Sequence, residues 1–315
     1  MARTLITGAA GNLGSLLARH LLAGGDEPRL MYHRRPLPPD LLASRATAVR
    51  ADLSRPETLG PALASTDVVV HFAGVLFAPG PERFLPVTNT RWFDNLVSAS
   101  LTAGVRKLIL ISFPHVEGPT SPEHPASGRL DGRPISVHAR TRLDEERLLF
   151  ARTRATGTTP VVLRLGMVYG RGILMIDAAR WLAARRLLAV WREPTWIQLI
   201  SAADCMAAIA AAIRGREVAG IYHIGDERPV TLQQFLDEAC RAWGYRPPRR
   251  LPVWLIEAVA AGCEAFATVA GTASPLTRDF LRIGRVSYCG DTSRMRRELV
   301  PQLQYPSLSE GLPTL

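Results

Sequence analysis

The sequence TGAAGNLG at residues 7–14 lies between a short apolar run and a helical pattern. Gly8 permits a tight turn, Gly11 lets the backbone approach a pyrophosphate, and Gly14 lets the helix pack closely against the strand. The amino end of that helix would present N–H groups to phosphates. The combination predicts a dinucleotide-binding loop, and a purely structural turn is the alternative. The predicted loop contacts are Gly8, Ala10, Gly11, Asn12, Leu13 and Gly14.

Apolar runs alternate with helical patterns through the first half of the chain. We expect strands at residues 3–7, 29–33, 47–51, 67–72, 107–112 and 160–164. We expect helices at residues 13–23, 56–63, 90–103 and 138–154. Alternation of this kind indicates βαβ units with right-handed crossovers. The predicted fold class is therefore α/β, with a doubly wound parallel Rossmann sheet.

The second half of the chain is less regular and predicts a smaller C-terminal substrate domain. We expect a dinucleotide-binding Rossmann domain at 1–170 and a substrate domain at 171–315, with residues 197–226 returning to the sheet. Within this half we expect a strand at 195–200, a helix that begins at Thr231, and a turn or linker at 246–250. The last of these has the sequence RPPRR.

The composition is basic but has only one lysine, Lys107. The 315 residues include 38 Lys and Arg against 28 Asp and Glu, a net charge of +10. A hydrophobic content of 47% with 21% charged residues excludes a disordered chain. The positive charge suggests that the protein binds a polyanion or a phosphorylated ligand. The sequence has no patterned run of basic and aromatic residues, so nucleic acid is not the expected partner. Four cysteines without metal-binding spacing, and no apparent signal peptide, predict a cytoplasmic protein without a bound metal.

Residues 253–270 form a long apolar stretch broken by Glu257 and Glu264, which fall on one helical face. Two carboxylates in mid-helix disfavour a membrane span. We expect an amphipathic helix that covers the substrate site or packs on the body of the protein. A peripheral membrane contact, helped by neighbouring arginines, is the alternative.

Several further motifs resemble the extended short-chain dehydrogenase/reductase superfamily, in its NAD-dependent epimerase/dehydratase-like branch. They include HFAG at 71–74, IS at 111–112, RLGMVYG at 164–170 and GIYHIG at 220–225, with Asp204 as a further landmark. The resemblance covers most of the chain and implies a nicotinamide dinucleotide cofactor. It adds, as implied cofactor contacts, Asp52, Leu53, Phe72, Ala73, Gly74, Asn89, Ser112, Arg142, Leu165 and Val168.

The segment after the second predicted strand bears on the choice of dinucleotide. An NAD site needs a carboxylate about 20 residues beyond the glycines to accept from the ribose hydroxyls. His33, Arg34 and Arg35 stand there, with no Asp or Glu between Leu30 and Pro39. Arginines suit a 2′-phosphate through charge-assisted hydrogen bonds. We therefore expect NADP(H) rather than NAD(H), with a solvated basic loop as the alternative.

The resemblance also implies a tyrosine and a lysine four residues apart on one helix, and this chain lacks both. His138 stands in the tyrosine position and Arg142 in the lysine position, while Ser112 is followed by Phe113 where a hydroxyl is usual. Histidine, with an unperturbed pKa near 6.5, suits acid–base catalysis. One hypothesis is an atypical oxidoreductase or epimerase that uses His138, Arg142 and Ser112. The other is a redox-inactive NADP(H)-binding protein or sensor, or a non-redox activity on the same fold.

Substrate contacts are expected from the loops beyond the fifth and sixth strands. The candidates are Phe113, His115, Tyr169, Arg192 and Trp196. The family handles nucleotide sugars, hydroxysteroids and related alcohols or ketones. The apolar 253–270 stretch favours a lipophilic carbonyl compound as the small-molecule substrate. The resemblance also implies a homodimer through the helices at 90–103 and 138–154.

Overall fold

A seven-stranded parallel sheet forms the body of the protein. The computed structural model describes residues 2–74, 80–270, 272 and 277–315. The strand order is β11-β6-β5-β4-β1-β2-β3. The strands are β1 (Thr4–Thr7), β2 (Arg29–Tyr32), β3 (Thr47–Arg50), β4 (Val68–His71), β5 (Lys107–Ser112), β6 (Thr159–Leu165) and β11 (Gly220–Ile224). This order confirms the predicted doubly wound sheet, and the six strands predicted in the first half begin and end within two residues of the observed ones.

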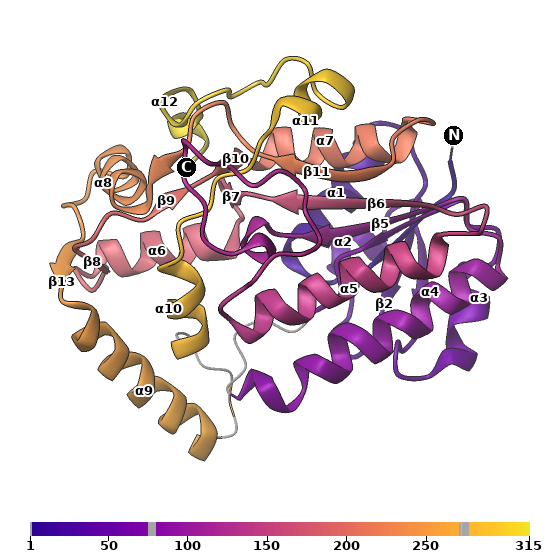
Figure 1. The fold of residues 1–315 in the computed structure, drawn as a ribbon, viewed down its shortest axis with the longest axis horizontal. Helices are drawn as coiled ribbons and strands as arrows, with labels where there is room; N and C mark the ends of the chain where they lie inside the picture. The colour runs from indigo at the N-terminus through magenta and orange to yellow at the C-terminus, as the bar shows by residue number, and fades with distance from the viewer. Residues whose placement is uncertain (1, 75–79, 271, 273–276) are drawn as a thin grey trace.

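Helices cover both faces of the sheet. The layer on one face contains α1 (Asn12–Ala23) and α7 (Ala202–Arg214), and the other contains α3 (Leu59–Leu63), α4 (Trp92–Thr102) and α5 (Val137–Thr153). Figure 1 shows α7 above the sheet and α4 and α5 below it. Because strand side chains alternate between faces, Ile6 packs in the first layer and Leu5 in the second. Strands buried on both faces explain the continuous apolar runs in the sequence.

The only lysine has a structural role at the far end of the sheet. Lys107 is buried at the start of β5, and its Nζ donates to the Ala212 carbonyl at 2.8 Å and to the Gly215 carbonyl. Burial lowers the pKa of Lys107. Its ammonium thus satisfies carbonyls at the carboxyl end of α7, away from the glycine loop.

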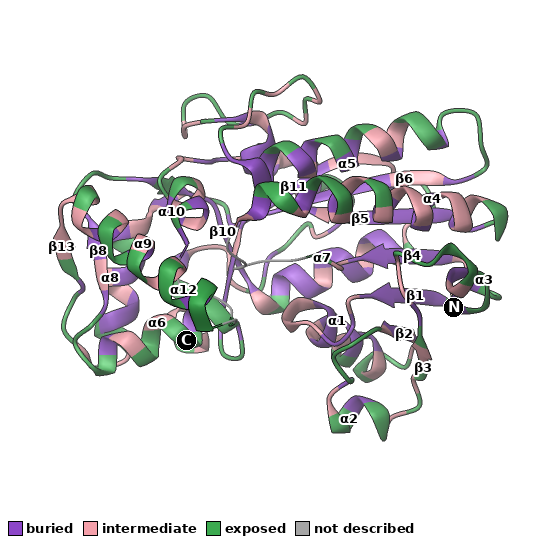
Figure 2. Cartoon of the chain, turned by 90° about the horizontal axis from the view of Figure 1, so that it is seen from below, coloured by how far each residue is buried: buried purple, intermediate pink, exposed green. Residues whose placement is uncertain are grey.

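A second lobe packs beyond the carboxyl ends of the strands. Its strands are β8 (Ala189–Trp191), β9 (Trp196–Ile197), β12 (Val230–Thr231) and β13 (Arg249–Leu251). Its helices are α6 (Leu174–Ala184), α8 (Leu232–Ala242), α9 (Val253–Ala270) and α10 (Arg278–Gly284). Within it, β13 pairs with β8 in parallel and β12 with β9 in antiparallel. Figure 2 shows this lobe at the opposite end of the molecule from α2 (Pro39–Leu42) and β3.

The remaining elements connect the lobe to the body. β10 (Leu199–Ser201) pairs with β7 (Met167–Tyr169), so residues 195–200 contribute to two short strands rather than one. The predicted turn at 246–250 is wrong at its end, because Arg249 and Arg250 belong to β13. The expected helix start is confirmed, since the Thr231 side chain accepts from the Gln234 N–H. Finally, α11 (Ser293–Glu298) and α12 (Leu308–Gly311) return to the body, where Arg294 stacks on Tyr222 beside β11.

Helix α9 is the long apolar helix that we expected to cover the substrate site or pack on the body of the protein. Among its residues only Ile256, Ala260 and Ala267 are buried. It is long and apolar enough to cross a membrane by length and composition, with a mean hydropathy of 1.6 and 17% of its residues buried. The helix therefore packs against the protein on one side, and its other side is exposed.

Candidate active site

The glycine loop has the geometry of a phosphate cradle. Gly8 has a φ of +70°, and a Cβ there would lie 2.9 Å from the Ala73 nitrogen. A Cβ on Gly14 would lie 2.4 Å from the Gly8 carbonyl oxygen, so α1 passes too close for any side chain. The Gly11 N–H donates to that carbonyl, and Gly11 caps α1 without a side chain over the first turn. Backbone N–H groups and the helix dipole at this point suit a pyrophosphate.

A hollow of about 370 Å³ runs from this loop along the carboxyl ends of β2, β3 and β4. This is where ligands bind in open α/β sheets. Its lining is Gly8, Ala10, Gly11, Met31, Tyr32, His33, Arg34, Arg35, Ala51, Asp52, Leu53, Phe72, Ala73, Gly74, Thr88 and Trp92. Most of the predicted cofactor contacts therefore share one groove. A larger hollow, about 710 Å³, lies beside Lys107 at the amino ends of the strands, away from the glycine loop.

The basic segment lies at the β2 end of this groove. His33 Nε2 lies 3.2 Å from Asp52 Oδ2, so the imidazole and the carboxylate lie side by side. Arg34 and Arg35 are exposed and line the groove. Among the described residues, no carboxylate forms an ion pair with either arginine. No described carboxylate therefore neutralises the positive charge that Arg34 and Arg35 place at the groove.

Two predicted cofactor contacts hold other elements in place through their side chains. Asn12 Nδ2 donates to the Gly172 carbonyl at 2.6 Å, and its Oδ1 accepts from the Leu174 N–H at 3.0 Å. Asn12 therefore ties the glycine loop to the start of α6. Asn89 is buried and donates to the Thr141 hydroxyl, next to Arg142 on α5. Leu165 and Val168, in β6 and β7, are buried in the core.

His138 lies in the first turn of α5 and pairs with a carboxylate that the sequence analysis did not identify. Its Nδ1 lies 2.9 Å from Oδ2 of Asp279 in α10, and the two side chains are only 9% and 8% exposed. Ser136 caps the helix by accepting from the Ala139 N–H at 3.1 Å, which fixes the first turn. A buried carboxylate on one ring nitrogen sets the orientation of the imidazole.

Arg142 is one turn further along α5 and reaches the groove. A Cβ on Gly74 would lie 3.0 Å from Arg142 Nη2, so the guanidinium covers the glycine turn after β4. Its Nη1 pairs with Glu145 Oε2 at 2.6 Å. Burial raises the pKa of Glu145 to about 8, although Arg142 opposes the shift. Burial, with a smaller effect of the Arg142 charge, lowers the pKa of His71 to about 3. The positive charge of Arg142 therefore acts on His71 at the end of β4.

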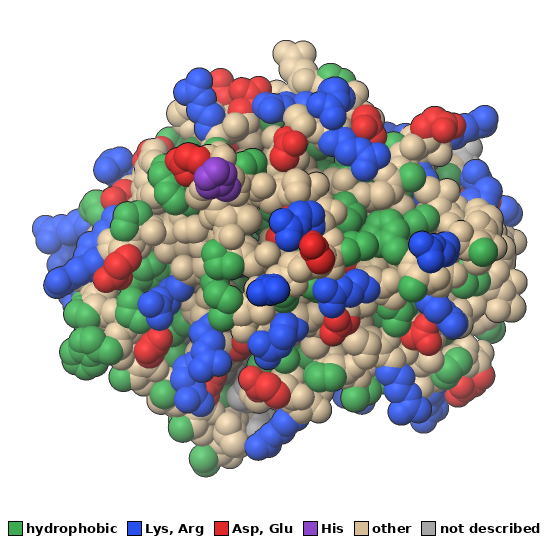
Figure 3. Space-filling view, viewed as in Figure 1, with side chains coloured by type: hydrophobic (Ala, Val, Ile, Leu, Met, Phe, Trp, Pro, Cys, Tyr) green, Lys and Arg blue, Asp and Glu red, His purple; other side chains and the backbone are tan. Residues whose placement is uncertain are grey.

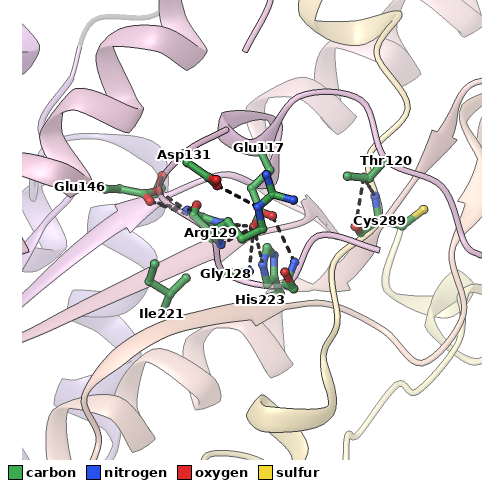
Figure 4. A network of polar contacts seen from close by, with 12 residues as sticks. Glu117, Thr120, Gly128, Arg129, Asp131, Glu146, Ile221, His223 and Cys289 are labelled. Carbon is green, nitrogen blue, oxygen red and sulfur yellow. Dashed lines mark hydrogen bonds and ion pairs between the residues drawn. The ribbon is translucent and has the colours of Figure 1, made fainter. Parts of the chain in front are cut away.

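Ser112 belongs to a buried ionic network rather than to the His138 pair. Its hydroxyl donates to Glu146 Oε1 at 2.5 Å, and Arg164 Nη2 binds Glu146 Oε2 at 2.6 Å. Arg164 also pairs with Glu117, which lies 3.4 Å from His223 Nε2. Figure 4 shows Glu146 at one end of this network and Glu117 with His223 at the other. Because its hydroxyl is bound to a buried carboxylate, the structure does not support Ser112 as a catalytic group.

The same network holds the loop that follows β5. Glu117 Oε1 accepts from the backbone N–H groups of Gly128 and Arg129 at 2.7 and 3.1 Å. Burial opposes ionisation, but the bond from His223 and the charge of Arg164 lower the pKa of Glu117 to about 2. An ionised Glu117 therefore fixes the loop beside the mouth of the site.

The predicted substrate contacts separate into two groups. Phe113, His115 and Tyr288 stack in a row, with ring centroids 5.1 and 4.1 Å apart, and burial lowers the pKa of His115 to about 3. Arg192 and Trp196 are exposed on the second lobe. Tyr169 is wrong as a substrate contact, because it is fully buried against Phe235 and the backbone of α12. Among the described residues, no group of three His, Cys, Asp or Glu is placed to hold a metal ion.

Comparison with known proteins gives the class. The model of the NAD dependent epimerase/dehydratase family matches residues 4–225, most of the chain, and the protein belongs to this family. The glycine cradle and the groove fit the nicotinamide dinucleotide cofactor of the family.

Similar proteins include reductases. The chain is 27% identical to a ceramide reductase of Caulobacter vibrioides, over 85% of this chain and 80% of that protein. It is 25% identical to a 2-alkyl-3-oxoalkanoate reductase of Shewanella oneidensis, over 84% and 72%. It is also 25% identical to a 4-hydroxy-2-methyl-3-oxo-4-farnesyl-3,4-dihydroquinoline-1-oxide ketoreductase of Stigmatella aurantiaca, over 74% and 71%.

Solved structures share the fold. MoeE5 in complex with UDP-glucuronic acid and NAD superposes with a TM-score of 0.78 at 22% identity, over 99% of this chain and 97% of that one. The Thermus thermophilus UDP-glucose 4-epimerase in complex with NAD has a TM-score of 0.76 at 21% identity, over 99% and 97%. The family model and the sequence relatives place the chain among NAD(P)-dependent oxidoreductases and epimerases, and the solved structures show the shared fold.

Proposed function

We propose that this protein is an NADP(H)-dependent reductase of a ketone on a lipophilic small molecule, with His138 as the proton donor. The observation that carries the proposal is the buried His138–Asp279 pair, one helical turn from Arg142 at the edge of the dinucleotide groove. A carboxylate that orients an imidazole is a common arrangement for general acid–base chemistry. In this proposal the His138–Asp279 pair supplies the proton transfer that the missing tyrosine and lysine would supply.

The reaction is a two-electron reduction. A reduced nicotinamide, when bound, supplies the hydride that adds to the carbonyl carbon. The imidazole of His138 donates a proton to the carbonyl oxygen while Asp279 holds the ring in one orientation through Nδ1. The products are the alcohol and the oxidised cofactor, and solvent returns a proton to His138. The reverse direction uses His138 as the base.

Arg142 has a binding role in this proposal. A guanidinium stays protonated, so it cannot exchange protons as a lysine does, but it presents five donors. Its contact with the Gly74 turn places these donors beside the groove, where they would bind ribose hydroxyls. The contact of 2.6 Å between its Nη1 and Glu145 Oε2 keeps the guanidinium in this position.

The choice of NADP(H) follows from Arg34 and Arg35. Both line the groove at the end of β2, about 20 residues beyond the glycine loop, where a Rossmann fold carries the residue that contacts the ribose 2′ position. A 2′-phosphate would pair with one or both guanidinium groups. An unphosphorylated ribose would leave them without an anionic partner.

The lipophilic substrate is supported by the names of the three relatives described above. These proteins are named for a ceramide, a 2-alkyl-3-oxoalkanoate and a farnesylated dihydroquinoline oxide. The stacked rings of Phe113, His115 and Tyr288 would give an apolar wall beside the site. By analogy with the family we further propose a cytoplasmic homodimer formed through α4 and α5, which light scattering would test.

The test measures cofactor binding and turnover separately. NADPH and NADH affinities come from fluorescence titration, and turnover comes from the loss of reduced-nicotinamide absorbance with a panel of long-chain 3-oxo esters. We expect turnover with NADPH that His138→Gln abolishes without changing NADPH affinity. His124→Gln, an exposed histidine in the loop after β5, is the matched control. Tight NADPH binding without turnover of any ketone would favour the alternative, a redox-inactive NADP(H)-binding protein.

A further inference from the structure

One side of helix α9 is an exposed apolar surface. We define the α9 face as Trp254, Ala258, Val259, Gly262, Ala265, Phe266 and Val269, all of them exposed. Their spacing of three and four residues places them in one stripe along the helix. Trp254, Phe266 and Val269 are 68%, 72% and 90% exposed. At 1.5 Å per residue the 18-residue helix is about 27 Å long.

The charged groups of α9 are turned away from this face and neutralised. Glu257 pairs with Arg285 at 3.1 Å, and Glu264 pairs with Arg278 at 2.7 Å. Both arginines belong to the segment formed by α10 and the residue that follows it. The α9 face consequently carries no ionisable side chain. A monomeric protein in water seldom exposes so continuous an apolar surface without a partner.

We propose that the α9 face is a contact surface for an anionic phospholipid bilayer, on which the helix lies flat. The surroundings are basic, since residues 246–285 contain six arginines, of which Arg246, Arg249 and Arg282 form no ion pair with a described carboxylate. Figure 3 shows basic and hydrophobic side chains together at the corner where Figure 1 places α9. Apolar side chains that enter the acyl boundary, with arginines beside the headgroups, are typical of interfacial helices.

A flat orientation agrees better with the contacts of α9 than a transmembrane one. The helix has 18 residues, and a span needs about 20. Ile256, Ala260 and Ala267 bury its other side against the protein, and the two ion pairs join it to the α10 segment. A transmembrane orientation would separate these groups or carry arginines into the hydrocarbon, which is costly.

The contact would bring the bilayer close to the proposed site. Arg278 pairs with Glu264 on α9, and the next residue, Asp279, pairs with His138 on α5. The α9 face and the His138 pair are thus held by adjacent residues of one short helix. Vesicle binding does not depend on the proposed reduction and is measured without cofactor or substrate.

The test is flotation of the full chain with vesicles of phosphatidylcholine and phosphatidylglycerol, compared with vesicles of phosphatidylcholine alone. We expect flotation with the anionic vesicles that added salt weakens. The variant Trp254→Ser/Phe266→Ser/Val269→Ser should lose at least about tenfold in partitioning, because three large apolar groups leave the contact. The single variant Phe266→Ser should also partition less strongly than the wild-type protein. Its control is Leu42→Ser, which replaces an exposed leucine on α2 at the far end of the molecule.

Unchanged NADPH affinity shows that the variants are folded. The proposal is overturned if the wild-type protein does not float with anionic vesicles, or if the triple variant floats equally well. Light scattering without vesicles tests whether a second copy of the chain binds the α9 face instead. If the wild-type protein is a dimer that the triple variant converts to monomers, a second copy of the chain covers the α9 face and the proposal is wrong.

Discussion

Substitution of Asp279 by Asn tests the role assigned to His138. Asparagine keeps the size of the side chain and an acceptor oxygen for His138 Nδ1, but it removes the charge from a bond of 2.9 Å between two nearly inaccessible groups. A hydrogen bond to a charged partner contributes about 1.5–3 kcal/mol. At about 1.4 kcal/mol per factor of ten, kcat/KM should fall about 10- to 100-fold. The proton is transferred only in the chemical step, so the loss should appear in kcat rather than KM.

The assay is steady-state NADPH oxidation with the best 3-oxo ester from the panel, together with NADPH titration. Asp279→Glu, which keeps the charge, should recover part of the rate, whereas a purely structural role would give no such recovery. Asp144→Asn is the matched control, because this exposed aspartate on α5 pairs only weakly with Arg147. A kcat for Asp279→Asn within about twofold of the wild-type value, in a protein that binds NADPH normally, would refute the reasoning.

Three other predictions concern the cofactor and stability. Replacing Arg34 and Arg35 by Ala should weaken NADPH binding at least about tenfold and NADH binding less than about twofold in fluorescence titration; equal losses would contradict the 2′-phosphate assignment. Glu146→Gln should lower the free energy of unfolding in urea by about 3 kcal/mol, because it removes a buried partner of Arg164; a change below about 1 kcal/mol would contradict that role. Burial, and after it the charge of Asp204, raise the pKa of Asp226 to about 7 in the folded protein. In the unfolded chain this carboxyl ionises at about pH 4, so between about pH 4 and 7 it is charged in the unfolded chain and neutral in the folded one. The contribution of Asp226 to stability therefore falls across that window, by up to about 1.4 kcal/mol per pH unit. Relative to the wild-type protein, Asp226→Asn should become progressively more stable from about pH 4 to 7, with a constant difference above about pH 7. Parallel wild-type and variant curves of melting temperature against pH would show that this shift is absent.

The sheet was predictable because its signals are local. Each strand is a short apolar run, and the glycine loop marks the first strand–helix turn. The pairing of β8 with β13 was not predictable, because it joins segments about 60 residues apart and β13 has the composition of a turn. The periodicity of α9 correctly placed Glu257 and Glu264 on one face. It carried no information about Arg278 and Arg285, which occupy that side and leave the opposite one open.

The cofactor groove was more predictable than the catalytic group. The groove residues follow the strands that carry them, so their sequence positions determine where they lie. Ser112 also ends its strand as expected, but the orientation of its hydroxyl depends on Glu146, a partner on another element. Asp279 lies 141 residues from His138, and local periodicity contains no trace of that contact. The only available signal was a carboxylate just inside a helix start, after Thr277, which is too common to single out a functional residue.

Helix α10 explains how a chain without the usual tyrosine and lysine still has an ordered site. This helix has seven residues. Arg278 pairs with Glu264 of α9, and Asp279 pairs with the imidazole of His138 on α5. Thr277 caps the helix by accepting from the Phe280 N–H, so both side chains start from a fixed first turn. A histidine needs an external group to fix its orientation and tautomer, and here that group comes from the second lobe. The packing of the second lobe against the Rossmann body therefore also assembles the acid–base pair, and any movement of α9 at a bilayer would reach His138 through two adjacent residues.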